Sequence, residues 1–467
     1  MRARAIVRRC LPSANPSFGL GLAAAALLVP GGAGSPAQVA AAAGIAAAAI
    51  LAVLLPTHWL LYGVILAIPF DNFAVAVGPL GISVSDALLV VVTLRWLLRA
   101  LYRGGRIARC ELYAPAGVFF VLLLPSFFAT FDLGVSLRQA FSILMMLLTA
   151  IVAANLLRSE SRAVGAVTWI LIASAIISLL GLVQLFIWAR YHVVLFQQNS
   201  DIVRIGDTKL LRLTATYFDP NYFALYLIAP IVLGLFLALE GQASPRYRAF
   251  AWLVVALGLA VFLMTFSRGA WVTLLAFMAA FVLLRARAPA RGVWLAMLIA
   301  VLIAAPVVTA MLVGINPTSV GRRLSLLRLG MEVMAAHPLT GTGLGTFRYL
   351  PQNELHRLAH STYIQVGADA GIPALLAFLV LMIVLGFNAI AALRGARPGM
   401  TRTVLLGCLF ALGCIAAQSA FLNALVLKHV WLLAGLTSGA AAAMRREGHA
   451  GGPVAPALTT PLAGQET

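Results

Sequence analysis

Long apolar segments separated by short polar stretches run through almost the whole chain. A segment of about 17 to 25 apolar residues can cross a bilayer as a helix, because a helix bonds its own backbone polar groups. The pattern predicts spans at residues 18–30, 37–55, 57–70, 84–101, 112–131, 134–156, 164–189, 220–240, 249–267, 269–285, 292–313, 362–390, 403–422 and 425–444. Because the first and third are short, we expect 12 to 14 membrane helices. The predicted fold class is an all-α, polytopic helical membrane protein.

The composition excludes a soluble protein. Of the 467 residues, 62% are apolar and only 10% are charged, and the mean hydropathy is +0.99. Soluble domains carry roughly a quarter charged residues. The net charge of +19 would suit a nucleic-acid partner, but the basic residues stand singly or in small groups between apolar runs. This is the pattern of membrane topology, so we expect contact with membrane lipids and none with nucleic acid.

The basic residues also predict how the helices run across the membrane, since short cytoplasmic loops retain arginine and lysine. With the N-terminus inside, the cytoplasmic segments hold 21 of the 33 basic residues. Nine of the other 12 lie in the two longest outer loops, residues 190–219 and 314–361. Long loops are exempt from the rule, and their cationic clusters suggest an anionic ligand on the outer face. We therefore expect both termini to be cytoplasmic.

The two ends of the chain differ from its apolar middle. Residues 1–10 are basic and precede an apolar run, as in signal peptides and in uncleaved signal anchors. A second apolar span follows at once, which favours the uncleaved anchor. We expect residues 1–446 to form one integral membrane domain. Residues 447–467, rich in Gly, Pro and Ala, are expected to be a disordered cytoplasmic tail.

The first long loop ends in Arg-Leu-Thr-Ala-Thr-Tyr-Phe-Asp-Pro-Asn, residues 212–221, where an apolar helix is expected to begin. Asp219 suits the N-cap of this helix, and Pro220 suits its first turn. The exposed N–H groups of a helix start and an arginine beside them can bind an anion, which makes Arg212 a candidate. The alternative is that Arg212 only extends to the lipid headgroups.

A very short connection between two spans carries Ser-Arg-Gly-Ala-Trp, residues 267–271. The alternation of the spans places this corner on the outer side, where a short loop has no topological reason to hold a basic residue. Arg268 is therefore a second candidate for binding an anionic substrate, and a headgroup contact is again the alternative.

The second long loop contains His-Pro-Leu-Thr-Gly-Thr-Gly-Leu-Gly-Thr-Phe, residues 337–347. The glycines do not follow a strand of a βαβ unit, and no Gly-Lys-Ser/Thr follows them. Neither a dinucleotide site nor a P-loop is therefore indicated. We expect the glycines to let the loop turn tightly, either over a site or simply as a turn.

His356 and His360 lie four residues apart before the predicted 362–390 span. A zincin would need Glu after the first histidine, whereas Arg357 stands there, so we expect no metal site. A histidine at the position of His360 can be neutral and accept a proton from a hydroxyl, or it can cap the helix. Asp369 lies about 14 Å deeper, where an acid needs a wet cavity or a partner such as an arginine.

These motifs occur together in one known family. The segment 212–221, the corner 267–271, the glycine-rich loop 337–347 and His-Ser-Thr-Tyr at 360–363, followed by Asp369, resemble the bacterial O-antigen ligase and O-antigen polymerase family. The resemblance covers residues 205–390. It rests on the order and spacing of the motifs and on their placement at one membrane face.

The resemblance implies a multi-pass glycosyltransferase of the bacterial inner membrane whose active site faces the periplasm. Such an enzyme moves a glycan from undecaprenyl pyrophosphate to an acceptor hydroxyl in one inverting step, without a metal or other cofactor. Arg212 and Arg268 match the family's two arginines, which are held to engage the pyrophosphate. His360 matches the histidine that is held to activate the acceptor.

Three further residues complete the expected substrate-binding set, namely Asp219, Asn221 and Asp369. The family usually has Glu where this chain has Asp369, which leaves the role of that acid open.

Three functions remain open at this point. A ligase would join a finished glycan to an acceptor such as the lipid A core, whereas a polymerase of the same fold would extend a growing O-antigen or exopolysaccharide. A flippase or other transporter is the remote alternative. It would be expected to carry ionisable residues at mid-membrane and two repeated halves, and the sequence shows few of the former and no internal repeat.

Overall fold

The computed structural model describes residues 55–77, 80–102, 109–195, 202–205, 208–239, 243–285, 317–394 and 396–450. Within these ranges the chain forms twelve α-helices, three short 3-10 helices and two hairpins of two strands each. Six of the described helices are long and apolar enough to cross a membrane, and three shorter helical segments are also apolar. The predicted all-α polytopic membrane fold is confirmed.

The predicted spans that fall on described residues coincide with helices. These helices are α4 (Thr57–Ala67), α5 (Val84–Tyr102), α6 (Tyr113–Leu123), α7 (Leu133–Leu156), α8 (Glu160–Tyr191), α9 (Pro220–Leu239), α10 (Pro245–Met264), α11 (Arg268–Arg285), α14 (Thr362–Leu393), α15 (Met400–Gln418) and α16 (Lys428–Ala450). The spans 18–30 and 292–313, nearly all of 37–55, the N-terminal anchor and the tail after residue 450 lie outside the described residues. Helix α16 extends four residues into the segment that was expected to be disordered.

The short elements stand in the connections between these helices. The 3-10 helices η1 (Ile68–Phe70) and η2 (Leu124–Phe128) extend α4 and α6, and η3 (Phe347–Tyr349) follows the glycine-rich loop. Strand β1 (Val75–Val77) pairs antiparallel with β2 (Leu80–Ile82), and β3 (Ile202–Ile205) pairs antiparallel with β4 (Thr208–Leu211).

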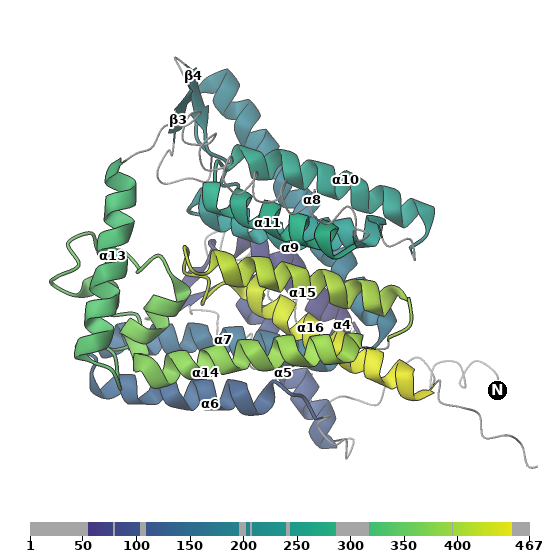
Figure 1. Ribbon diagram of the computed structural model, residues 1–467, viewed down its shortest axis with the longest axis horizontal. Helices are drawn as coiled ribbons and strands as arrows, with labels where there is room; N and C mark the ends of the chain where they lie inside the picture. The colour runs from purple at the N-terminus through teal and green to yellow at the C-terminus, as the bar shows by residue number, and fades with distance from the viewer. Residues whose placement is uncertain are drawn as a thin grey trace, which may run out of the picture.

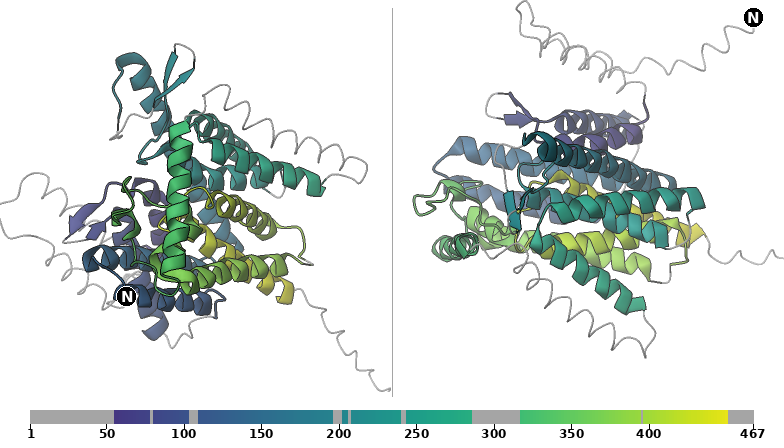
Figure 2. Two further views of the ribbon diagram at one scale, coloured as in Figure 1. Left: turned by 60° about the vertical axis from the view of Figure 1, so that its left-hand side comes forward. Right: turned by 90° about the horizontal axis from the view of Figure 1, so that it is seen from above.

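Most of the long helices run side by side, whereas helix α13 (Pro317–Ala336) crosses their ends (Figure 1). The left view of Figure 2 shows α13 standing in front of these ends. These residues were predicted to be part of the second long outer loop, residues 314–361. Helix α13 is instead held by a small core in which Leu326 and Val333 pack with Phe347 and Ala359. We call this end of the bundle the α13 end.

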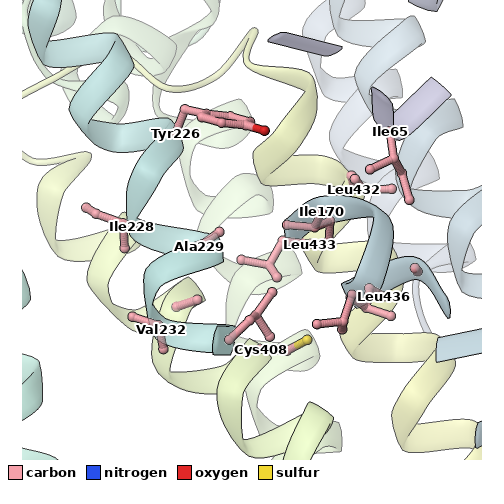
Figure 3. Close-up of a cluster of buried hydrophobic side chains, with 14 of the residues drawn as sticks. Ile65, Ile170, Tyr226, Ile228, Ala229, Val232, Cys408, Leu432, Leu433 and Leu436 are labelled. Atoms are coloured by element: carbon pink, nitrogen blue, oxygen red, sulfur yellow. The ribbon is translucent and has the colours of Figure 1, made fainter. Parts of the chain in front are cut away.

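Helix α9 forms the centre of the bundle. Over its apolar window 83% of the residues are buried, a larger share than in the other candidate spans of the described chain. A helix that is apolar all round is expected to be enclosed by other helices. Figure 3 shows Ile228 and Val232 of α9 facing the same core as Cys408 of α15 and Leu433 of α16. The central position of α9 fixes where its first residues emerge at the α13 end.

The two groups of basic residues lie at opposite ends of the bundle. The loops that were predicted to be outside, with Arg212 and α13, lie at the α13 end. At the other end Arg158 donates a hydrogen bond to the backbone oxygen of Arg109, and Arg445 pairs with Glu111. Arg109, Arg158 and Arg445 are among the 21 basic residues that were predicted to be cytoplasmic. The basic residues of the predicted outer loops and these three arginines are therefore at opposite ends of the bundle, as the topology prediction requires.

Candidate functional site

Four chain segments meet at the α13 end. Helices α9, α11 and α14 begin there, at Pro220, Arg268 and Thr362, and α15 ends there, at Gln418. Of the candidate residues from the sequence, Asp219, Asn221, Arg268 and His360 are in or just before the first turns of these three helices. Arg212 directly follows β4, and Asp369 lies about two turns into α14. The helix starts therefore determine the geometry of the site.

The start of α9 has the predicted cap. The backbone oxygen of Asp219 accepts hydrogen bonds from the N–H groups of Tyr222 and Phe223. One carboxylate oxygen of Asp219 accepts bonds from the backbone N–H and the side-chain amide of Asn221, both at 2.7 Å. Pro220 is the first helical residue. Asp219 thus caps the N-terminus of α9 and fixes the orientation of the Asn221 amide.

Asn221 joins the two arginine motifs. Its side-chain oxygen accepts a hydrogen bond from a terminal nitrogen of Arg212 at 3.3 Å and one from the hydroxyl of Ser267 at 2.9 Å. Arg212 also donates from Nε to the backbone oxygen of Thr265 at 2.9 Å. The first-loop motif and the corner before α11 are therefore held together by side-chain and backbone bonds.

The corner before α11 is a tight turn. Phe266 has a φ of 51°, in the left-handed region, and its backbone oxygen lies 3.5 Å from Arg212. Ser267 starts the helix by accepting the N–H of Trp271 on its backbone oxygen. Arg268 is the first helical residue and is half-buried. The structure thus brings Arg212 and Arg268 to neighbouring positions, together with Asp219 and Asn221.

The end of α15 connects this corner to the start of α14. Gln418 packs against Gly269 and accepts a hydrogen bond from the hydroxyl of Thr273 at 3.0 Å. The next residue, Ser419, accepts the backbone N–H of Thr362 at 2.8 Å. Because Thr362 is the first residue of α14, only Ser361 separates it from His360. Arg268 and His360 therefore flank one helix end.

His360 is half-buried and has a φ of 53°. Burial is the largest cause that lowers its pKa below the ordinary value of 6.5, and the charge of Arg323 lowers it further. The carboxylate of Asp219 raises the pKa and Arg357 lowers it, each by less. The side chain is therefore neutral at physiological pH and lies within electrostatic reach of the start of α9. A neutral imidazole can accept a proton from a hydroxyl.

Asp369 lies apart from the arginines. Its side chain is only 2% exposed, and its oxygens accept bonds from the Gln365 amide at 2.8 Å and from the backbone N–H of Phe347 at 3.3 Å. The backbone oxygen of Asp369 accepts the N–H of Gly343 at 3.1 Å. In the structure Asp369 thus anchors the glycine-rich loop to α14.

The glycine-rich loop requires its glycines. Gly341, Gly343 and Gly345 all have φ between 61° and 109°, a region that residues with a side chain rarely adopt. A side-chain carbon at Gly341 would come within 2.5 Å of the backbone oxygen of Ala368. One at Gly371, where α14 is kinked, would come within 2.5 Å of Leu339. The loop and the kink therefore lie directly against each other.

Two features of this end were missed from the sequence. Lys428 lies buried at the start of α16 and pairs with Asp71 at 3.0 Å and Asp86 at 2.9 Å. Lys428 is one of only two lysines in a chain with few acidic residues. This rarity could have indicated from the sequence that Lys428 forms a buried ion-pair network. The second feature is Arg348, whose Nε is buried without a hydrogen-bond partner in the part of the chain described.

The fold and the site together define a polytopic helical membrane protein with a cationic, histidine-containing site at one end of its helices. The model of the O-antigen ligase family matches residues 253–379. The matched range contains Arg268, His360 and Asp369, whereas Arg212 precedes it. This match confirms the family resemblance that the motifs indicated. No curated protein matches the chain.

The family consists of membrane glycosyltransferases that ligate or polymerise glycans. The helices and the family match together identify a multi-pass bacterial membrane protein with a role in polysaccharide biosynthesis.

Proposed function

We propose that the chain transfers a glycan from a polyprenyl-pyrophosphate carrier, undecaprenyl pyrophosphate, to an acceptor hydroxyl at the periplasmic side of the inner membrane. The observation that carries the proposal is that Asn221 and Ser267 bond Arg212 to the corner that bears Arg268. The end of α15 connects this corner to the segment that bears the neutral His360. Two cations and one base in this order supply what a single displacement at a sugar carbon needs. No nucleotide sugar, metal or other cofactor takes part in the step.

The arginines act on the leaving group. As the bond between the sugar carbon and the phosphate oxygen breaks, negative charge grows on the carrier pyrophosphate. Guanidinium groups placed at that charge stabilise the transition state more than the ground state. Asn221 and Asp219 hold Arg212 in place through the contacts described above, so their part in donor binding is to position the cation.

His360 acts on the acceptor. The acceptor oxygen attacks the sugar carbon from the face opposite the pyrophosphate, and its proton passes to the imidazole. The new carbon–oxygen bond forms as the old one breaks, which inverts the configuration at that carbon. The carrier leaves as its pyrophosphate, and the imidazolium later returns the proton to water.

Arginine variants test the assignment. Arg212→Ala and Arg268→Ala should each lose about 2 to 4 kcal/mol of transition-state stabilisation, a rate loss of roughly 30-fold to 1,000-fold. Lysine should restore only part of the rate, because a point charge lacks the planar fork of the guanidinium. Arg138→Ala is the matched control, since Arg138 lies exposed near the start of α7. Turnover close to wild type in either site variant, at equal expression, would remove that arginine from the mechanism.

The family description favours a ligase, which joins a finished glycan to an acceptor such as the lipid A core. Deletion of the gene followed by gel analysis of surface glycans tests this choice. A ligase deletion should lose the lipid-linked ladder and accumulate polymer on the carrier. Products with a single repeat unit would instead identify a polymerase that extends a growing glycan.

A further inference from the structure

The segment that begins with Arg212 has no regular secondary structure to fix it. Residues 212–219, all within the described ranges, lie between β4 and α9 and belong to neither a helix nor a strand. Leu213 donates its N–H to the backbone oxygen of Met264, the last residue of α10, at 3.0 Å. Ala215 has a φ of 47°, in the left-handed region that residues with a side chain rarely adopt. Bonds to neighbouring elements must hold this segment, because a strained backbone persists only where its surroundings determine it.

Gln184 of α8 binds the strained part of the segment. Its side chain is buried, and its oxygen accepts the N–H groups of Thr214 at 3.2 Å and of Ala215 at 3.0 Å. Its nitrogen donates to the hydroxyl of Thr214 at 3.3 Å and to the backbone oxygen of Leu195 at 2.7 Å. A glutamine amide has two N–H donors and an oxygen that accepts two bonds, so its whole capacity is used. Gln184 therefore fixes the two residues at which the chain turns.

Residues 69–72, which follow α4, bind the next residue of the segment. The Asn72 amide donates to the backbone oxygen of Thr216 at 2.7 Å. The hydroxyl of Thr216 donates to the backbone oxygen of Pro69. Thr216 is itself buried, so its backbone and its side chain both depend on residues 69–72 for hydrogen bonds.

A buried ion-pair network fixes residues 69–72 in turn. Asp71, which directly precedes Asn72, pairs with Lys428, the first residue of α16, at 3.0 Å. Lys428 also pairs with Asp86 of α5 at 2.9 Å. Removing one partner of a buried pair leaves an uncompensated charge, so these pairs hold their segments firmly together. The network thus connects the start of α16 to the contact between Asn72 and the segment that begins with Arg212.

We propose that Gln184 and Asn72 are positioning residues for Arg212. Lys428 is a third positioning residue, which acts through Asn72. Together they hold residues 214–216 in the turn that sets where the Arg212 guanidinium meets the carrier pyrophosphate. The inference rests on the proposed function and adds residues that act through Arg212 rather than on the substrate. A displacement of about 1 Å at a reacting group can slow an enzyme about 10²-fold, so a loss of position is measurable as a loss of turnover.

A double-mutant cycle separates positioning from fold stability. A residue that acts through Arg212 loses its effect on turnover once the guanidinium is removed, because the effects of coupled residues are not additive. A residue that only stabilises the fold lowers the amount of active protein by the same factor whether or not the guanidinium is present.

The test uses the purified full-length protein, a carrier-linked glycan as donor and an envelope glycolipid extract of the source bacterium as acceptor. The donor glycan is radiolabelled, which keeps the residual turnover of Arg212→Ala measurable. Gln184→Ala, Asn72→Ala and Lys428→Met are each made in the wild type and in Arg212→Ala. For every variant kcat, both KM values and the melting temperature are measured.

Asn155→Ala is the matched control. Asn155 is half-buried, as Asn72 is, and its oxygen accepts the hydroxyl of Tyr113 at 3.0 Å. It therefore joins α7 to α6 with a bond of the same kind, near the end of the bundle that holds Arg158. This variant reports the effect of a lost asparagine bond that has no connection to Arg212.

In the wild-type background each of the three variants should lower kcat about tenfold or more, but no further than Arg212→Ala does, and should leave the acceptor KM unchanged. In Arg212→Ala the same substitutions should change kcat by no more than about twofold. Asn155→Ala should change kcat by the same small factor in both backgrounds. Asn72 is only half-buried, so its variant should fold even if Gln184→Ala and Lys428→Met do not.

An equal loss of kcat in both backgrounds would show that these bonds only stabilise the fold, which would overturn the inference and leave the proposed function intact. A wild-type kcat in Asn72→Ala would likewise overturn it, and so would a loss as large in Asn155→Ala. Turnover close to wild type in Arg212→Ala would overturn the proposed role of that arginine and this inference together. A wild type that makes no product would overturn the whole proposed function.

Discussion

At the scale of single residues, His360 shows how position sets chemistry. It occupies a left-handed backbone conformation directly before α14, half-buried and close to both cationic and anionic side chains. Burial and Arg323 both disfavour its charged form. His356 has a similar φ of 50° but is exposed, and its Nδ1 lies 3.3 Å from the backbone oxygen of Arg348. Two histidines four residues apart thus differ in environment, which a sequence pattern alone does not reveal.

Alanine variants of the two histidines should therefore differ. His360→Ala should reduce turnover by about 10²-fold to 10⁴-fold, because a general base is lost, while donor binding through the arginines persists. His356→Ala should be much milder. Turnover and donor binding measured side by side check this. Two equally inactive variants would show that the histidines act together, for instance on a metal, and wild-type activity lost on chelation would show the same.

The pH dependence of kcat/KM should report the environment of His360. The base must be neutral to act, so activity should be constant near neutrality and fall with decreasing pH only below the ordinary histidine value of 6.5. Because the charge of Arg323 lowers the pKa, Arg323→Gln should move this acid limb to higher pH, whereas Arg328→Gln should leave it in place. An acid limb of the wild type above 6.5, or no shift in Arg323→Gln, would contradict the account.

At the scale of elements, the glycine-rich loop and the kinked α14 act as one unit. Pro338 accepts the N–H of Ile372 at 2.7 Å, and Thr342 donates to Ala368 at 3.0 Å. These bonds, with those of Asp369, fix the loop that leads to Arg348 and His360. The sequence predicted tight turns at the glycines from their residue type. The partner of the loop was not predictable, because no local pattern states which helix a distant loop contacts.

A substitution at Gly371 tests this unit. Gly371 has a φ of 86°, and a side-chain carbon there would approach Leu339 to 2.5 Å. Gly371→Ala should destabilise the protein by about 1 to 3 kcal/mol or more through backbone strain and displace the loop. Gly386→Ala on the same helix has nothing within 4 Å and should be neutral or slightly stabilising. Thermal unfolding in detergent compares the two variants, and equal melting temperatures would refute the close packing of loop and helix.

The remaining differences between prediction and structure also arise at this scale. The cap of α9 was predictable because Asp219 and Pro220 act within one turn. Helix α13 was not, because it lies across the bundle end and needs only one apolar face, formed by Leu326 and Val333. The link from the end of α15 to α11, through Gln418, and to α14, through Ser419, was likewise hidden, since it joins segments that are far apart in the chain.

At the scale of the whole molecule, the separation of basic residues defines two ends. The described parts of both long loops lie at the α13 end with the candidate site (Figures 1 and 2). Arg109, Arg158 and Arg445, which were predicted to be cytoplasmic, lie at the other end. Successive membrane helices run in opposite directions, so the alternation of the predicted spans assigns each loop to one end of the bundle. The separation of the loops was therefore predictable from the sequence. Which end faces the periplasm remains a prediction from the charge distribution.

Reporter fusions test the orientation. A phosphatase that is active only in the periplasm should be active when fused within the segment 337–347. The same phosphatase should be inactive when fused after Pro245, at the start of α10, or after Arg397, before α15. The reason is that short loops with arginines stay in the cytoplasm. Activity after Pro245 or Arg397 would reverse the topology and place the candidate site on the cytoplasmic side.

The most direct test of the central claim is a stoichiometric turnover measurement with the purified protein in lipid nanodiscs. The donor is glycan linked to undecaprenyl pyrophosphate, the acceptor is the envelope glycolipid extract, and a chelator is present. We predict that the protein releases one carrier pyrophosphate for each glycosylated acceptor, and that Arg268→Ala suppresses both products together. A wild type that forms neither product, or that forms glycosylated acceptor only with a nucleotide sugar or added metal, would contradict the account.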